Sequence, residues 1–155
     1  MGKPPESILI LRLGGIGEVL AITPALQALR TTWPGTRITL LAERPAADIA
    51  AGFVNEILTA NAPYRANGIG SLLRPEFYAE SVRLVEGLLR RKFDLYLDFH
   101  HLFGWRHIVK PMLVGLLARA PRRVGFTNGG AGFFLTDPVP DPDDRHMAER
   151  SRALL

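Results

Sequence analysis

The stretch ILILRLGGIGEVLAITPAL, residues Ile8 to Leu26, decides the fold class. It opens with an aliphatic run, Ile8–Leu13, that lies between a Pro- and Ser-containing segment and a glycine cluster. Such a run is typical of a strand buried on both faces of a parallel sheet. After the glycines, apolar residues recur at helical spacing as far as Trp33, and Pro34 and Gly35 end the pattern. The stretch therefore predicts a strand, a tight turn and a helix, with a kink in the helix at Pro24.

Strand and helix patterns alternate through the rest of the chain. The aliphatic and β-branched runs predict strands over Arg37–Ala42, Glu56–Thr59, Phe93–Asp98 and Arg123–Phe126, and a short extended piece over Phe133–Leu135. Helical spacing predicts helices over Pro45–Gly52, Pro75–Arg91 and Gly104–Ala118, the last interrupted at Pro111. Regular alternation implies right-handed crossovers, and hence an α/β domain with a doubly wound parallel sheet and helices on both faces.

The end of the chain predicts a domain boundary. A proline-rich connector over 137–142 precedes a last helix, which begins at Asp143 or Asp144 and is still running at Leu155. We therefore expect one Rossmann-like domain at residues 1–142. Residues 143–155 would begin a helix that leads toward a further domain.

Composition excludes several classes of protein. The 155 residues are 47% hydrophobic and 22% charged, as in folded globular domains. The absence of cysteine excludes disulfides and thiolate metal sites. No segment approaches the ~20 apolar residues of a membrane span, and the start of the chain lacks a signal-peptide core, so we expect a cytoplasmic protein. The net charge of +4 favours anionic partners, although its basic clusters, 90–92 and 119–123, fall at predicted helix ends, where cations complement the helix dipole.

The glycine cluster lies where doubly wound sheets bind ligands, at the carboxyl end of a strand. Gly14, Gly15 and Gly17 allow the backbone to turn sharply and to approach a ligand, and the N–H groups of the next helix favour an anion. A dinucleotide fingerprint requires G-x-G-x-x-G, whereas this chain has G-G-x-G. The acid that ends the second predicted strand, Glu43, also lies further along than that fingerprint expects. A nicotinamide or flavin cofactor is therefore not expected.

Glu18, directly after the glycines, has two interpretations. A carboxylate in the first turn of a helix is stabilised by the dipole, by about 0.3–1 kcal/mol. A carboxylate at the mouth of a crevice can also take a proton from an incoming hydroxyl, which is general base catalysis. The residues alone leave both interpretations open.

Three stretches resemble one known family. ILILRLGGIGEVLAITPALQALRTTWPGTRITLLAE, Ile8–Glu43, resembles the N-terminal half of the ADP-heptose:lipopolysaccharide heptosyltransferases, glycosyltransferase family 9. RRKFDLYLDFHHL, Arg90–Leu102, is similar to the family's strand that ends in Asp-x-Gln-Gly. HMAERSRALL, His146–Leu155, is similar to its His-x-x-Glu-Arg helix. The resemblance implies one half of a GT-B architecture, in which two Rossmann-like domains face each other across a cleft.

The same resemblance implies an activity and a set of partners. The N-terminal domain of such enzymes binds the sugar acceptor and the C-terminal domain binds the ADP-sugar donor. The enzymes invert the anomeric configuration, need no metal and work at the cytoplasmic side of the inner membrane. We therefore expect a lipopolysaccharide core acceptor or a similar anionic glycolipid, an ADP-sugar, no cofactor, no nucleic acid and peripheral contact with the membrane. This half alone is not expected to turn over substrate.

Residue roles carry over by position. The family's catalytic base is an Asp directly after the glycine turn, which makes Glu18, one methylene longer, the candidate base. The candidate substrate-binding residues are Gly14, Gly15, Gly17, Arg65, Asp98, His100, His101, His146, Glu149 and Arg150. The pair His100-His101 replaces the family's Gln-Gly, and a basic residue usual a few positions later is absent at Gly104 and Trp105, so the acceptor pocket is expected to differ.

Structural explanations compete with these roles. Asp98 can cap the following helix or hold its loop, and Glu149 and Arg150 can form an exposed ion pair. His100 and His101 have no third ligand at helical spacing, so no metal site is expected. The alternative function is a non-catalytic, Rossmann-like module that binds a glycolipid or an anion, in which Glu18 only begins a helix. Charge-driven nucleic-acid binding lacks both an aromatic-basic stripe and a helix-turn-helix pattern.

Overall fold

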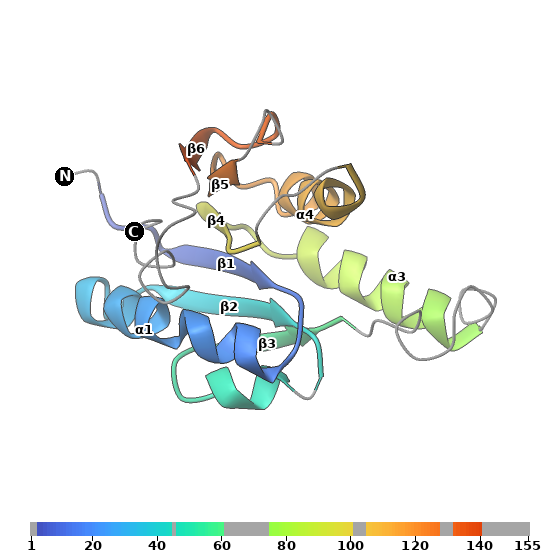
Figure 1. Ribbon diagram of the computed structural model, residues 1–155, viewed down its shortest axis with the longest axis horizontal. Helices are drawn as coiled ribbons and strands as arrows, with labels where there is room; N and C mark the ends of the chain where they lie inside the picture. The colour runs from blue at the N-terminus through green and yellow to red at the C-terminus, as the bar shows by residue number, and fades with distance from the viewer. Residues whose placement is uncertain (1–2, 45, 61–74, 101–104, 128–131, 141–155) are drawn as a thin grey trace.

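A computed structural model describes residues 3–44, 46–60, 75–100, 105–127 and 132–140. This part of the chain forms a six-stranded sheet, parallel throughout, in the order β3-β2-β1-β4-β5-β6 (Figure 1). The strands are β1 (Ser7–Arg12), β2 (Arg37–Ala42), β3 (Glu56–Thr59), β4 (Leu95–Asp98), β5 (Arg122–Thr127) and β6 (Asp137–Pro140). The helices are α1 (Ile16–Thr32), the short 3-10 helix η1 (Ala46–Ala50), α3 (Pro75–Leu89) and α4 (Trp105–Leu117). The predicted doubly wound parallel sheet is confirmed.

The winding direction reverses between β1 and β4. The chain adds β2 and β3 on one side of β1, then returns to place β4, β5 and β6 on the other side. The two central strands pair in parallel as far as Leu11 opposite Asp98. Ligands of doubly wound sheets bind beyond the carboxyl ends of the strands at such a reversal. The fold therefore directs attention to the residues that follow Leu11 and Asp98.

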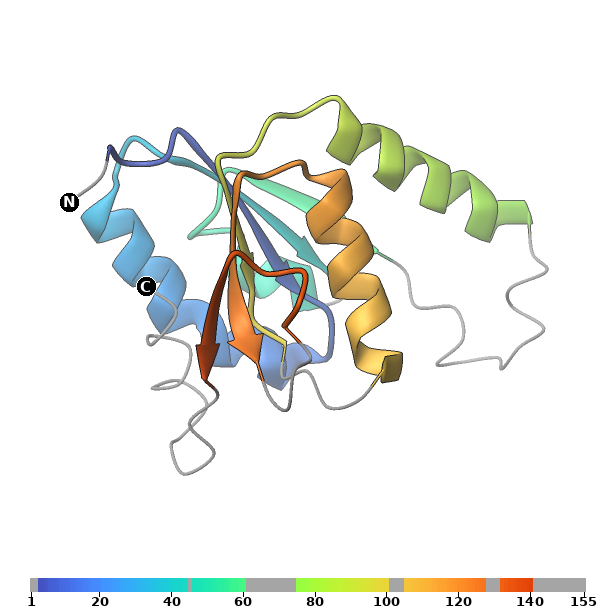
Figure 2. The ribbon, with the colours of Figure 1, turned by 90° about the horizontal axis from the view of Figure 1, so that it is seen from above.

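Helices cover both faces of the sheet, as Figures 1 and 2 show. On one face, Ile8 and Ile10 of β1 pack in a buried cluster with residues of α1 and η1. On the other face, Leu9 and Leu11 pack in a second cluster with residues of β4, α3 and α4. Because successive side chains of β1 enter opposite cores, the strand must be apolar at nearly every position. This requirement explains the aliphatic run that the sequence displays.

The last strand differs from the prediction. Phe133–Leu135, predicted to be extended, lies in a turn that is closed by a 2.9 Å hydrogen bond from the Leu135 N–H to the Gly132 carbonyl. The strand lies in the predicted connector instead, at β6, where Pro138 and Pro140 pair with β5. Proline cannot donate to a sheet ladder, but β6 is the edge of this sheet and pairs on one side only. The sequence pattern predicted a linker at these prolines, because a local pattern does not show which strands lie at the edge of a sheet.

Two prolines lie inside helices. Both α1, which contains Pro24, and α4, which contains Pro111, run without a break, so the predicted interruption at Pro111 is wrong. In α1 the ring of Pro24 cannot donate to the Leu20 carbonyl, and the Thr23 hydroxyl donates to it instead, at 2.8 Å. A neighbouring hydroxyl thus replaces one lost backbone bond. The kink at Pro24 stays a prediction.

The basic clusters have structural partners. The Arg91 guanidinium pairs with the Glu56 carboxylate and donates to the Gly87 carbonyl. Arg123 donates to the carbonyls of Phe134 and Ala120, at 2.7 and 2.9 Å. These arginines therefore hold helix ends and loops to the sheet.

Among the described residues, no helix is both long enough and apolar enough to cross a bilayer.

Tyr96 gives a test of this core by pH. Its ring is buried beneath α4, and its hydroxyl donates to the Pro111 carbonyl at 2.9 Å. Burial, with a contribution from the charge of Asp98, raises the pKa of the Tyr96 phenol well above its ordinary value of about 10. The folded protein thus keeps this proton at a pH where the unfolded chain has lost it. The contribution to stability is complete below pH about 10 and falls as the pH rises further.

We expect the free energy of unfolding to fall as the pH rises above about 10, and to fall less steeply in Tyr96→Phe. Urea unfolding of both proteins at several pH values measures the two slopes. Equal slopes would show that Tyr96 ionises as readily in the fold as in the unfolded chain.

Candidate functional site

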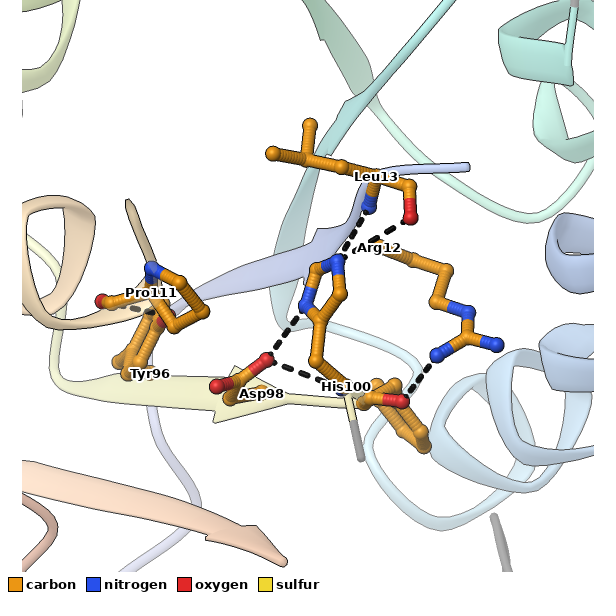
Figure 3. A network of polar contacts seen from close by, with 7 residues as sticks. Arg12, Leu13, Tyr96, Asp98, His100 and Pro111 are labelled. Carbon is orange, nitrogen blue, oxygen red and sulfur yellow. Dashed lines mark hydrogen bonds and ion pairs between the residues drawn. The ribbon is translucent and has the colours of Figure 1, made fainter. Parts of the chain in front are cut away.

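Four charged or titratable side chains meet beyond the carboxyl ends of β1 and β4. Arg12 ends β1, Glu18 lies in the first turn of α1, and Asp98 and His100 lie at and just after the end of β4. Figure 3 shows how Arg12, Asp98 and His100 lie around the backbone that leaves β1. The cluster therefore occupies the point of the sheet where the winding reverses.

Glu18 folds back onto the start of its own helix. The N–H of Gly15, the residue before the first helical position, donates to Glu18 Oε2 at 2.7 Å. The carboxylate thus satisfies one of the backbone donors that the first turn of a helix leaves unpaired, as the Glu of a capping box does. Among the described residues no hydrogen bond reaches the other oxygen, Oε1, and the side chain is only partly buried.

Gly14 has a backbone conformation that favours glycine. Its φ of +149° lies in a region that L side chains rarely adopt, and a Cβ built on it would lie 1.4 Å from Glu18 Oε2. In contrast, a Cβ on Gly15 or Gly17 would have no atom within 4 Å. Within the cluster predicted as a ligand cradle, Gly14 is therefore the position whose backbone favours glycine, and a side chain there would displace the end of the Glu18 side chain. Ligand binding by these three residues stays a prediction.

Arg12 belongs to this cluster, although the sequence analysis did not single it out. It is only 4% exposed, and its guanidinium donates to the Phe99 carbonyl. Burial lowers the pKa of Arg12 below its usual range, whereas the negative charges of Glu18 and Asp98 act in the opposite direction. Its signal was present in the sequence, because a single cation inside an aliphatic strand requires compensating groups in the core.

Asp98 and His100 form a hydrogen-bonded pair. Asp98 is fully buried, and its Oδ1 accepts from the His100 N–H at 3.0 Å and lies 2.7 Å from His100 Nδ1. The other ring nitrogen, Nε2, lies 2.9 Å from the Leu13 amide nitrogen. On the far side, a Cβ on Gly125 would lie 3.0 Å from the Asp98 Cβ, so glycine in β5 leaves space for this side chain. Asp98 Oδ2 is buried and has no hydrogen-bond partner among the described residues.

The structure thus brings together part of the predicted site. Gly14, Gly15, Gly17, Glu18, Asp98 and His100 lie around the carboxyl ends of the two central strands. The predicted site residues Arg65, His101, His146, Glu149 and Arg150 lie outside the described residues. Asp98 and His100 turn toward the backbone of β1, which favours a role in holding the turn over direct contact with a ligand.

Two cavities lie away from this cluster. The larger, of about 460 Å³, is at the opposite edge of the sheet, near Ser7 and Asp94. Its carboxylates are already used: Asp94 accepts from the N–H groups of Glu6 and Ser7, and Glu56 pairs with Arg91. The smaller, of about 400 Å³, lies by the ends of β2 and β3 and is lined by Arg44, Ala47, Asp48, Ile57 and Thr59. Only the smaller cavity lies at the edge where doubly wound sheets bind ligands.

Within the described ranges, no group of three or more His, Asp or Glu side chains lies close enough together to hold a metal ion.

The different roles of the glycines can be tested by substitution. Gly14→Ala would strain the backbone and push the Glu18 carboxylate away from the Gly15 N–H, so we expect a loss of about 1–3 kcal/mol in the free energy of unfolding. Gly17→Ala lies in the helix in open space and should be neutral or stabilising by up to about 1 kcal/mol. Urea unfolding measures both, and an equal effect of the two substitutions would contradict the assignment.

Comparisons with known proteins bear on the fold. No protein-family model matches the sequence, and no curated protein matches it. Among solved structures, E. coli heptosyltransferase WaaC with ADP matches with a TM-score of 0.79 and 22% identity, over 96% of this chain and 46% of that one. The same enzyme with ADP-2-deoxy-2-fluoro heptose matches with a TM-score of 0.74 and 20% identity, again over 96% of this chain and 46% of that one. A glycosyltransferase of family 9 from Veillonella parvula matches with a TM-score of 0.70 and 19% identity, over 96% of this chain and 40% of that one.

The chain spans less than half the length of each of these structures. The resemblance expected from the sequence is therefore found in three dimensions. We conclude that the protein shares its fold with a portion of the heptosyltransferase WaaC and of a family 9 glycosyltransferase.

Proposed function

We propose that the chain is the acceptor-binding half of an inverting glycosyltransferase, and that Glu18 is its catalytic base. The observation that carries the proposal is the position of the Glu18 carboxylate. It lies beside the point where the winding reverses, with Oε2 fixed by the Gly15 N–H and with no described hydrogen bond to Oε1. A carboxylate oxygen that is held in place and still available is what proton transfer from a hydroxyl requires.

In the proposed reaction, Glu18 Oε1 accepts the proton of an acceptor hydroxyl while the hydroxyl oxygen attacks the anomeric carbon of the donor sugar. The bond from that carbon to the diphosphate oxygen breaks, ADP leaves, and the configuration inverts. The Gly15 N–H is already bound to Oε2, so a phosphate group could use it only by displacing the carboxylate. This competition favours the interpretation of Glu18 as a base over that of the glycine turn as a phosphate cradle.

The solved structures support the proposed donor class. The two WaaC structures contain ADP and an ADP-heptose analogue, which makes an ADP-sugar the donor that we propose. We assign it to a second Rossmann-like lobe that closes on this one in a GT-B arrangement. Ile16 and Leu20 support such a lobe, because these apolar side chains begin α1 beside Glu18 and are 53% and 56% exposed.

A lipopolysaccharide core or a similar anionic glycolipid is the proposed acceptor, which would place the enzyme in peripheral contact with the cytoplasmic side of the inner membrane. Arg65, His101, His146, Glu149 and Arg150 remain its proposed contacts. No cofactor and no nucleic acid enter the proposal.

One observation favours the alternative, a non-catalytic module that binds a glycolipid or an anion. The bond from the Gly15 N–H gives the Glu18 carboxylate a capping role that needs no catalysis. The catalytic base requires the negative charge of Glu18, whereas the non-catalytic module requires only its hydrogen bond with the Gly15 N–H.

Glu18→Gln separates the two roles. A glutamine in this position can still accept the Gly15 N–H, because capping boxes use Glu or Gln, but it cannot take a proton from a hydroxyl. In the protein that contains this chain together with a donor-binding lobe, we expect kcat for transfer from ADP-heptose to a lipopolysaccharide core acceptor to fall about 10²–10⁴-fold. Acceptor affinity, measured by calorimetry, should change little.

Glu18→Ala is the matched control, because it removes both the charge and the cap. It should lower the free energy of unfolding, by about 0.5–2 kcal/mol, in addition to lowering kcat. Unchanged turnover in Glu18→Gln would exclude the base and leave the non-catalytic module.

A further inference from the structure

The backbone ladder between β1 and β4 stops short of the glycine turn. Among the described residues, the last backbone bond between them runs from the Phe99 N–H to the Leu11 carbonyl, at 3.2 Å. Two residues further along, Leu13 has left the strand, and Gly14 follows it with a positive φ. Side-chain contacts beyond this bond therefore help to fix the direction in which the chain enters the turn that bears Glu18.

The His100 side chain takes the place of the next rung. Its Nε2 lies 2.9 Å from the Leu13 amide nitrogen and 3.1 Å from the Leu13 carbonyl oxygen, across 87 residues of sequence. In Figure 3 the ring stands between Asp98 and the backbone of Leu13. A side chain from β4 thus continues the pairing onto the residue that precedes Gly14.

Leu13 and Asp98 together determine which ring nitrogen carries the proton. The Leu13 N–H donates to Nε2, so in the neutral ring the proton lies on Nδ1, which is 2.7 Å from Asp98 Oδ1 and donates to it. Because Asp98 is fully buried and also accepts the His100 N–H, its position leaves the ring little freedom.

We propose that His100 and Asp98 are positioning residues, which fix the backbone of Leu13 and thereby aim the Gly14–Gly15 turn that holds the Glu18 carboxylate. The catalytic consequence rests on the proposed function, whereas the positioning does not. The path is short: Leu13 is followed by Gly14, whose missing Cβ accommodates Glu18 Oε2, and then by Gly15, whose N–H binds that oxygen. A shift at Leu13 would therefore move the donor that orients the carboxylate.

The tautomer gives a direct spectroscopic test on the chain itself. In ¹⁵N-labelled protein at neutral pH, we expect His100 to show a protonated Nδ1 and an unprotonated Nε2, with a scalar coupling across the hydrogen bond between Nε2 and the Leu13 amide nitrogen. A proton on Nε2, or the absence of this coupling, would overturn the proposal.

Substitution gives a second test, by amide hydrogen exchange. In His100→Ala we expect exchange of the Leu13 N–H to accelerate by about tenfold or more, and that of the Gly15 N–H to accelerate with it. In His100→Gln the side-chain amide can accept the Leu13 N–H and donate to the Leu13 carbonyl, so protection should return toward that of the parent chain. This conservative variant keeps the test valid if the alanine variant unfolds.

Asp94→Ala is the matched control at the opposite end of β1. Asp94 lies just before β4 and accepts the N–H groups of Glu6 and Ser7, at 2.8 and 2.9 Å. Its removal should accelerate exchange at Ser7 and leave the relative protection of Leu13 and Gly15 unchanged. Equal acceleration at Leu13 in both variants would mean that His100 contributes only general stability, and would overturn the proposal.

Turnover distinguishes this inference from the proposed function. In the protein with its donor-binding lobe, His100→Ala should lower kcat more than it raises KM, and His100→Gln should recover most of kcat. If exchange and tautomer behave as expected while no variant and no parent transfers sugar, the proposed function fails and the positioning role stands. Altered exchange at Leu13 with unaltered exchange at Gly15 would refute the link to Glu18.

Discussion

The buried carboxylate of Asp98 is the constraint on which the arrangement of the site depends. It is fully buried between apolar layers, where an uncompensated charge is unfavourable. Asp98 Oδ1 accepts the backbone N–H of His100 and contacts the His100 ring nitrogen Nδ1, and the charge of Arg12 lies nearby. Both groups also bind backbone across the β1–β4 junction, so the compensation of one charge ties together the carboxyl ends of the two central strands.

The β4 segment holds β1 at both ends. At the amino end of β1, Asp94 accepts the N–H groups of Glu6 and Ser7. At its carboxyl end, His100 accepts the N–H of Leu13. Between these contacts, residues Ile8–Leu11 of β1 are apolar and pack into both cores. At the amino end of β1, the carboxylate of Asp94 is paired with backbone N–H groups. At the carboxyl end, Ile16 and Leu20 of α1 are about half exposed, and Glu18 Oε1 has no described hydrogen bond. This asymmetry matches the edge at which doubly wound sheets bind ligands.

The glycine turn binds a carboxylate of the protein itself. Glycines before a helix are often interpreted as a phosphate cradle, because the helix start offers N–H groups to an anion. In this structure the Glu18 carboxylate accepts the N–H of Gly15, and Gly14 supplies the positive φ of the turn. A protein carboxylate at a helix start thus uses an N–H group that a bound phosphate would also use.

The sequence by itself determined the fold, because its signals are local. The strands over Arg37–Ala42 and Glu56–Thr59 have the predicted bounds. The first of them is buried from Ile38 to Ala42, and a run that is buried on both faces must be largely apolar whatever its neighbours are. The Glu18 cap was also within reach, since it joins residues three apart. Only the tertiary structure decided the roles of Arg12, Asp98 and His100 and the edge position of β6. These features depend on strand order and on contacts across 87 residues, which local periodicity does not encode.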